Sequence, residues 1–110
     1  MNARTTTTSE EKEAYEQALF AAEIGEAPEI DLHGMRVEEA LGILESFLHA
    51  ELMQGTQVIK IIHGRGSGVL RDVIHAWLTE QKELVLYFRE AEEQKAHGAI
   101  TYAVLESIRN

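Results

Sequence analysis

The stretch Val58-Ile59-Lys60-Ile61-Ile62-His63-Gly64-Arg65-Gly66-Ser67-Gly68 contains two abrupt changes of pattern. It begins with an apolar run rich in β-branched residues, which predicts a strand buried on both faces. Three glycines follow at every second position, and apolar residues then recur from Val69 to Leu78 at spacings of three and four, as in an amphipathic helix. The sequence therefore predicts a buried strand, a glycine turn and a helix that begins at once.

The start of that helix is a candidate anion site. The first backbone N–H groups of a helix lack internal partners, and the helix dipole favours negative charge there. Arg65 adds a planar guanidinium suited to phosphate. The stretch is neither a Walker A loop nor the dinucleotide fingerprint, which requires glycine where Val69 stands. Two interpretations remain: a phosphate-binding loop, or a tight turn in which Ser67 is the N-cap.

Length and composition limit the class of protein. The chain has 110 residues, 45% of them hydrophobic, and no cysteine. We expect one small domain with its own core, without disulfides or cysteine-bound metal, in a reducing cytoplasm. No apolar stretch is long enough to span a bilayer, and the N-terminus lacks the apolar region of a signal peptide, so no membrane partner is expected.

The charge is strongly negative and uneven. The net charge is −9, which argues against non-specific binding of nucleic acid. Residues 1–29 hold seven acids and two bases, a net charge of −5, and residues 30–110 carry the other −4. Any surface that binds a polyanion must therefore be local.

Residues 1–28 are expected to lie outside the main domain, which we place at residues 29–108. Residues 1–8 are polar and predict disorder. An acidic helix should run from an N-cap at Ser9 to Ile24, with Gly25 ending it. Its apolar stripe is thin, which favours a helix that lies on the domain surface or frays. The alternative is a helix that docks a protein partner.

The rest of the chain predicts the order β-α-β-α-β-β. The expected elements are strands at 29–32, 58–62, 83–89 and 99–105, and helices at 36–53 and from 69 to near 81. In the third strand, Leu84, Leu86 and Phe88 should share one face. Helical crossovers predict that the first three strands are parallel neighbours, and the loop at 90–98 predicts an antiparallel final pair. The fold class is therefore α/β with a mixed four-stranded sheet, preceded by a helix.

This topology brings two groups of polar residues together. Asp31, His33 and Gly34 follow the first strand, and residues 63–68 follow the second. Ligands of parallel β-α-β units bind at the carboxyl ends of the strands. If these two strands are neighbours, a carboxylate, two imidazoles, a guanidinium and free N–H groups meet at one edge.

Two motifs resemble those of the small MutS-related (Smr) domain. Ile30-Asp31-Leu32-His33-Gly34 is similar to the opening motif of that family, and His63-Gly64-Arg65-Gly66 is similar to its His-Gly-x-Gly motif. The resemblance covers about residues 29–106. It implies a two-layer α/β sandwich like the C-terminal domain of bacterial translation initiation factor three. It also implies nicking or cleavage of nucleic acid, either DNA or RNA on stalled ribosomes.

The resemblance carries over to particular positions. The Asp-x-His pair of the family falls on Asp31 and His33, and its glycine loop on residues 64–66. MutS2-type members often have arginine where this chain has His33, so the chain resembles a stand-alone member. It departs from the family at His97-Gly98, where a glycine pair is common. It also departs in the preceding loop, which is acidic.

We predict three catalytic residues. His33 is the candidate general base, since a histidine titrates near neutral pH, and Asp31 would orient it. His63 is either the general acid or a side chain that packs beneath the loop and fixes its shape. The alternative roles of His33 and Asp31 are a backbone contact at the helix start and a strand-end cap.

We predict a larger set of phosphate-binding residues. Arg65 is the strongest candidate, because a glycine loop offers a long cation few structural partners. Arg36 and Arg71 lie within a turn of the loops, where they either bind phosphates or offset nearby glutamates. Lys60 should lie at a sheet edge or extend to solvent, and His49, His75 and His97 should be ordinary surface residues. The complete predicted set is Gly34, Arg36, Gly64, Arg65, Gly66, Ser67, Gly68 and Arg71.

These observations lead to two hypotheses. The first is an endonuclease that acts on RNA or structured DNA. The second is a module that binds nucleic acid or the ribosome without cleaving it. A small nucleotide-binding domain is less favoured, because the chain has little room for a base pocket. No cofactor or metal site is predicted, and a divalent metal is expected only if DNA is cleaved, since water must then attack.

Overall fold

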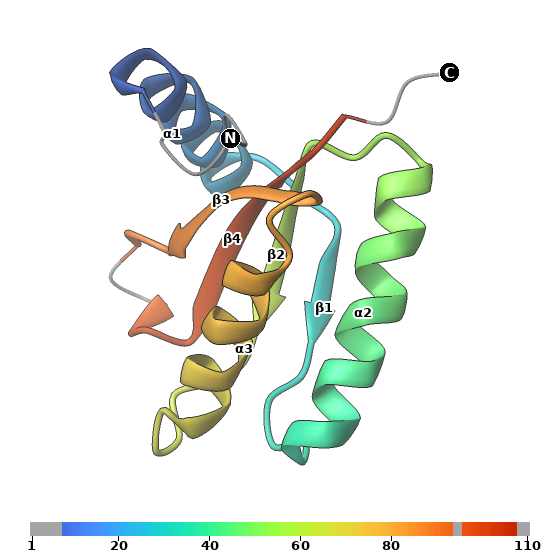
Figure 1. The fold of residues 1–110 in the computed structure, drawn as a ribbon. Helices are drawn as coiled ribbons and strands as arrows, with labels where there is room; N and C mark the ends of the chain where they lie inside the picture. The colour runs from blue at the N-terminus through green and yellow to red at the C-terminus, as the bar shows by residue number, and fades with distance from the viewer. Residues whose placement is uncertain (1–7, 94–95, 108–110) are drawn as a thin grey trace.

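A computed structural model describes residues 8–93 and 96–107 of the chain. The predicted disorder of residues 1–8 falls, apart from Thr8, outside the described residues. The elements follow the predicted order (Figure 1). They are α1 (Ser9–Ile24), β1 (Glu29–Asp31), α2 (Val37–Met53), β2 (Val58–Ile62), α3 (Val69–Glu80), β3 (Val85–Glu90) and β4 (Ile100–Leu105).

The four strands form one mixed sheet in the order β1-β2-β4-β3. β1 and β2 are parallel neighbours as predicted, with Asp31 beside Ile62. The prediction that β2 and β3 are also neighbours was wrong, because β4 lies between them and is antiparallel to both. β4 is buried from Thr101 to Leu105, as expected of a central strand that is covered on both faces.

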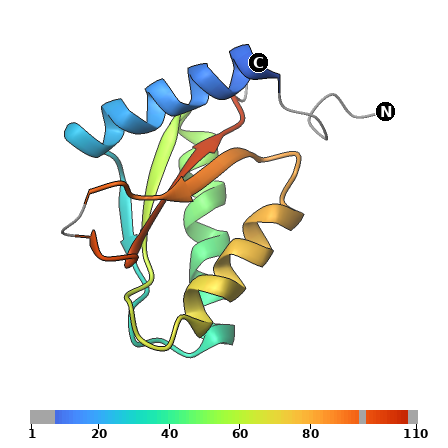
Figure 2. The ribbon, with the colours of Figure 1, turned by 90° about the vertical axis from the view of Figure 1, so that its left-hand side faces the viewer.

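Helices cover both faces of the sheet (Figure 2). α2 and α3 pack on one face over a core that includes Leu44, Leu48, Ile59 and Ile74, all fully buried. α1 lies across the other face, where Leu19 is fully buried among Val58, Tyr102 and Val104. The α/β class with a mixed sheet and an N-terminal helix is thus confirmed.

A polar cluster attaches α1 to β3 and to the loop that follows it. Glu16 accepts hydrogen bonds from the Tyr87 hydroxyl at 2.6 Å and from Arg89 Nε at 2.8 Å. Glu23 lies 3.3 Å from Arg89 Nη1 and accepts the backbone N–H groups of residues 92 and 93. The hydrogen bond from Tyr87 is the main cause that lowers the pKa of the Glu16 carboxyl. These contacts fix α1 and the acidic β3–β4 loop relative to each other.

Two local predictions need correction. The N-cap of α1 is Thr8 rather than Ser9, because Thr8 forms a reciprocal capping box with Glu11, which stabilises the earlier start. In β3, a register shift between Val85 and Tyr87 interrupts the alternation. Leu84 and Phe88 therefore pack on the α2–α3 side, whereas Leu86 packs on the α1 side, as a bulge requires.

Candidate functional site

The two predicted loops meet at one end of the sheet. The backbone N–H of Leu32 donates to the carbonyl of Ile62 at 2.7 Å, which extends the β1–β2 pairing into the loops. Gly64 passes so close to His33 that a Cβ on Gly64 would lie 2.9 Å from the His33 Cβ. The predicted adjacency of the two motifs is confirmed.

A pocket of about 500 Å³ lies between these loops. Figure 1 shows that α2 and α3 begin at this same end of the molecule. Three arginines and no carboxylate line the pocket, so it is a basic site within an acidic chain. The lining residues are His33, Gly34, Met35, Arg36, Val37 and the run from His63 to Arg71.

Both helices begin without a side-chain cap. Arg36 and Gly68 are the N-cap residues of α2 and α3, and neither makes a side-chain capping hydrogen bond. Ser67 is therefore not the N-cap, although its hydroxyl accepts the Val69 N–H at 3.4 Å. The first N–H groups of both helices can bind an anion. The α2 terminus was missed by the sequence analysis, although arginine at an N-cap position was a signal for it.

Asp31 and His33 form a bonded pair. Nδ1–H of His33 donates to Oδ1 of Asp31 at 2.6 Å, and the His33 backbone N–H donates to the same oxygen at 3.1 Å. These bonds, the side-chain bond first, hold the pKa of the Asp31 carboxyl below its ordinary value. Because Asp31 accepts a hydrogen bond from Nδ1–H, the hydrogen of a neutral His33 is on Nδ1, and its Nε2 carries a free lone pair. No hydrogen bond engages that nitrogen in the part of the chain that the structure describes.

His63 lies beneath the glycine loop, only 3% exposed. Its Nδ1 is 3.0 Å from the Gly64 carbonyl and its Nε2 is 2.8 Å from the Thr101 hydroxyl. Burial lowers the pKa of His63. With both ring nitrogens bonded inside the protein, the geometry favours the loop-fixing alternative for His63 over the role of general acid.

The prediction that His75 is an ordinary surface residue was wrong. Its Nε2 is 2.7 Å from the Thr101 hydroxyl, and its ring contacts those of His63 and Phe88. Burial is the main cause that lowers its pKa. Neither His75 nor Thr101 was selected from the sequence, because their contacts join α3 to a strand 26 residues away.

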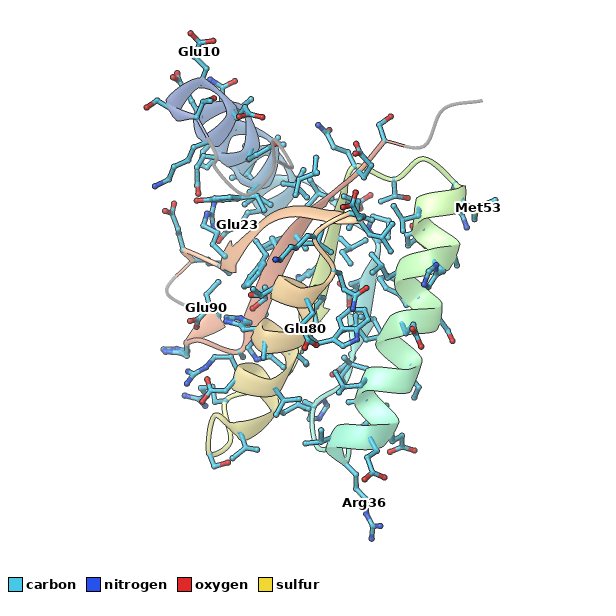
Figure 3. The ribbon with its side chains drawn as sticks, in the orientation of Figure 1. Glu10, Glu23, Arg36, Met53, Glu80 and Glu90 are labelled. Carbon is cyan, nitrogen blue, oxygen red and sulfur yellow. The ribbon has the colours of Figure 1, made fainter. Side chains whose placement is uncertain are left out.

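The three arginines differ in their contacts. Arg65 is exposed, and within the described residues its side chain has no ion pair or hydrogen bond. Figure 3 shows Arg36 at the start of α2, pointing away from the body of the molecule. Arg71 is bonded to Asp72 at 3.1 Å, and its guanidinium lies against Gly68, where an added Cβ would be 2.9 Å away. Arg65 and Arg36 are thus the cations most available to a ligand.

The remaining candidates lie outside the pocket. Lys60 is on the internal strand β2, with its ammonium 3.8 Å from Glu29. His49 and His97 are exposed, as predicted. Among the described residues there is no cluster of three or more side chains that could hold a metal ion. No helix in the described part of the chain is both long and apolar enough to cross a membrane.

The fold and the paired loops define a member of a known family. The Smr domain family model matches residues 30–106, and the chain therefore belongs to the Smr domain family. Among its relatives, the endonuclease MutS2 of Lactobacillus gasseri is 37% identical over 71 residues, which are 64% of this chain and 9% of that protein. The MutS2 of Thermomicrobium roseum is 43% identical over 53 residues, 48% of this chain and 7% of that protein. The chain thus corresponds to less than a tenth of these relatives.

Solved structures show the same fold. The Smr domain of Thermus thermophilus MutS2 superimposes with a TM-score of 0.67 and 29% identity, covering 72% of this chain and 98% of that one. YdaL, a stand-alone small MutS-related protein from Escherichia coli, gives a TM-score of 0.69 and 26% identity, covering 81% and 74%.

Proposed function

We propose that this protein is an endonuclease that cleaves phosphodiester bonds of RNA or structured DNA in the pocket between the two loops. The observation that carries the proposal is the bonded Asp31–His33 pair and the nearby Arg65, which has no ion pair with any described residue, at the open ends of two helices. That combination offers a base, a cation and N–H donors to one phosphate. The name endonuclease, which the MutS2 relatives carry, supports the same activity.

For RNA, the proposed step uses side chains that line or adjoin the pocket. Nε2 of His33 takes the proton of a 2′-hydroxyl, and the 2′-oxygen attacks the adjacent phosphorus. The bond from phosphorus to the 5′-oxygen breaks, which leaves a 2′,3′-cyclic phosphate, and the 5′-oxygen takes a proton from solvent. Arg65 and the N–H groups of the glycine loop stabilise the charge that develops on the phosphoryl oxygens. Asp31 stays ionised and stabilises the imidazolium that forms.

For DNA, water takes the place of the 2′-hydroxyl. A divalent metal would supply the nucleophile by lowering the pKa of a bound water, but the described residues offer no cluster of three side chains to hold it. His33 would accept a proton from the attacking water. Cleavage assays with and without chelator separate the two substrates and the two modes of attack.

The alternative function is a binding module for nucleic acid or the ribosome. It is favoured by the outer surface of α1, where Phe20 and Ile24 are 57% and 71% exposed one helical turn apart. Such a pair can dock a protein partner. In this case the pocket grips phosphates and α1 recruits the partner, without any cleavage.

A paired measurement on two variants separates these functions. His33→Ala should lower the cleavage rate by about 10²–10⁴ while leaving affinity almost unchanged, because it removes only the base. Arg65→Ala should weaken binding and reduce the salt dependence by roughly one phosphate contact. Exposed His49→Ala and Lys82→Ala are the matched controls, and both should behave as wild type.

Two outcomes would contradict the proposal. Full activity of a folded His33→Ala protein would show that His33 is not the base. A wild-type protein that binds but does not cleave RNA, nicked DNA or branched DNA, with Mg²⁺ or with chelator, would establish the binding module.

A further inference from the structure

A continuous chain of hydrogen bonds connects α3 to the glycine loop through the middle of the sheet. It runs from His75 Nε2 to the Thr101 hydroxyl at 2.7 Å, from that hydroxyl to His63 Nε2 at 2.8 Å, and from His63 Nδ1 to the Gly64 carbonyl at 3.0 Å. Thr101 is fully buried and His63 is 3% exposed. Water therefore cannot easily replace the bond between these two side chains.

The hydrogens of this chain can be assigned from its ends. The Gly64 carbonyl can only accept, so Nδ1 of His63 must carry a hydrogen. A neutral His63 then accepts at Nε2, and the single hydrogen of the Thr101 hydroxyl is used to donate to it. The Thr101 oxygen is left to accept, so His75 must carry its hydrogen on Nε2. All the bonds point one way, from His75 through Thr101 and His63 to Gly64.

Adding a proton to His63 would force this order to change. The Thr101 hydroxyl would have to turn toward His75, and an imidazolium would lie in a buried site. Burial lowers the pKa of both histidines, which supports the neutral arrangement. Among the charged groups, Glu90 raises the pKa of both histidines and Arg71 lowers it. The pKa of His75 is also lowered by His63 and raised by Asp72.

The last bond of the chain acts on the loop itself. The N–H groups of His63 and Gly64 both donate to the Ala99 carbonyl, at 3.0 and 3.1 Å. The His63 ring holds the next peptide group, between Gly64 and Arg65, through the Gly64 carbonyl. Gly64 is thereby held against His33, within the loop that lines the pocket.

We propose that Thr101 and His75 are positioning residues for the glycine loop, which they hold by fixing the tautomer of the buried His63. Neither residue lines the pocket, so they act only through His63. That the positioned loop binds phosphate rests on the proposed function, whereas the hydrogen-bond order does not.

The tautomers of the free, full-length protein give the first test. Nitrogen-15 NMR of the imidazole rings at neutral pH should show hydrogen on Nδ1 of His63 and on Nε2 of His75, with the other two nitrogens unprotonated. A His63 that carries its hydrogen on Nε2, or that is doubly protonated at neutral pH, would overturn the proposal. This measurement needs no nucleic acid, so its result is independent of the proposed function.

Substitutions at Thr101 give the second test. Thr101→Val removes the hydroxyl at nearly constant shape, and Thr101→Ser retains it. In Thr101→Val the amides of Gly64 and Gly68 should exchange faster in the free protein. Affinity for a single-stranded RNA oligonucleotide should fall about tenfold, because only a fraction of the loops is then competent. His75→Phe keeps a ring in place and should have a smaller effect, since Thr101 still donates to His63.

The salt dependence distinguishes positioning from direct contact. Thr101→Val should keep the wild-type slope of affinity against salt, whereas Arg65→Ala should reduce it by about one contact. Thr101→Ser should restore both exchange and affinity. The proposal is contradicted if Thr101→Val leaves the loop amides unchanged, or if Thr101→Ser behaves like Thr101→Val. If the loop loosens as expected but no variant alters RNA binding, the positioning network stands and the proposed function fails.

Discussion

Gly64 is the residue at which the two motifs touch. Its φ is +78°, in the left-handed region, and the position of a Cβ there lies 2.9 Å from the His33 Cβ. Gly66 also has a positive φ, but nothing lies within 4 Å of its Cβ position. Replacing either glycine would therefore strain the backbone, but only a side chain at Gly64 would also collide with His33.

We predict that Gly64→Ala damages the site more than Gly66→Ala. Both variants should lose about 1–2 kcal/mol of stability, because an L-residue is strained in the left-handed region. Gly64→Ala should in addition displace His33 and lower cleavage beyond the effect of Gly66→Ala. Thermal melts and cleavage rates, with the chemical shifts of the His33 ring, test this. Equal losses in the two variants would show that the close approach to His33 has no functional consequence.

Single residues differ in how well the sequence predicts them. Asp31, His33 and Arg65 could be placed because each lies in a short motif at a strand end, where the topology assigns a direction. His75 and Thr101 could not, because their contact depends on where β4 inserts in the sheet. The glycines at every second position of residues 64–68 were visible in the sequence, but the close approach of Gly64 to His33 was not.

At the scale of elements, strand order shows the limit of local patterns. The crossover through α2 correctly implies that β1 and β2 are parallel neighbours. The crossover through α3 equally allows another strand to insert, and β4 does so. The apolar run Ile100–Leu105 was a usable signal, because a strand buried on both faces belongs in the middle of a sheet. The second face of β4 is covered by α1.

α1 contributes more to the fold than its thin apolar stripe suggested. Leu19 is fully buried against the sheet, whereas its neighbour Phe20 is 57% exposed. Small residues such as Ala18 and Ala22 allow the helix to lie close to β4. The bonds of Glu16 and Glu23 to β3 and its loop add polar contacts that no helical periodicity reveals.

We predict that Leu19→Ala destabilises the whole protein by about 2–5 kcal/mol, the range for truncating a buried leucine. Phe20→Ala, the adjacent control, should change the free energy of unfolding by less than about 0.5 kcal/mol. Chemical denaturation of both variants measures the difference. If Leu19→Ala unfolds like wild type, α1 is only laid on the surface and the core does not depend on it.

At the scale of the whole molecule, the net charge opposes the proposed function. The chain carries a net charge of −9, yet the pocket is lined by three arginines and no carboxylate. The sequence already required any polyanion-binding surface to be local. The fold separates the basic pocket from the rest of the acidic chain, because the starts of α2 and α3 and the three arginines of the pocket lie at one end of the molecule. Figure 3 shows Arg36 at that end and Glu10 at the far end of α1.

The β3–β4 loop carries negative charge on the same segment that contacts the glycine loop. The carbonyl of Ala99, at the end of this loop, accepts the N–H groups of His63 and Gly64. Glu92 and Glu93 are exposed on the loop, and their backbone N–H groups are held by Glu23. Their carboxylates can therefore be neutralised without removing the bonds that shape the loop.

We predict that the double substitution Glu92→Gln and Glu93→Gln increases affinity for an RNA oligonucleotide, because the loop that contacts the glycine loop then repels a polyanion less. The gain should be several-fold at about 0.01 M salt, where the Debye length is about 30 Å, and absent at about 1 M, where it is about 3 Å. Binding isotherms across this range test the effect.

The control is Glu10→Gln with Glu13→Gln, which changes the net charge equally on exposed positions of α1. If both pairs raise affinity alike, the total charge governs binding; if only the loop pair does, the acidic loop limits access to the pocket. A loop pair with no effect at low salt would show that nucleic acid does not pass beside this loop.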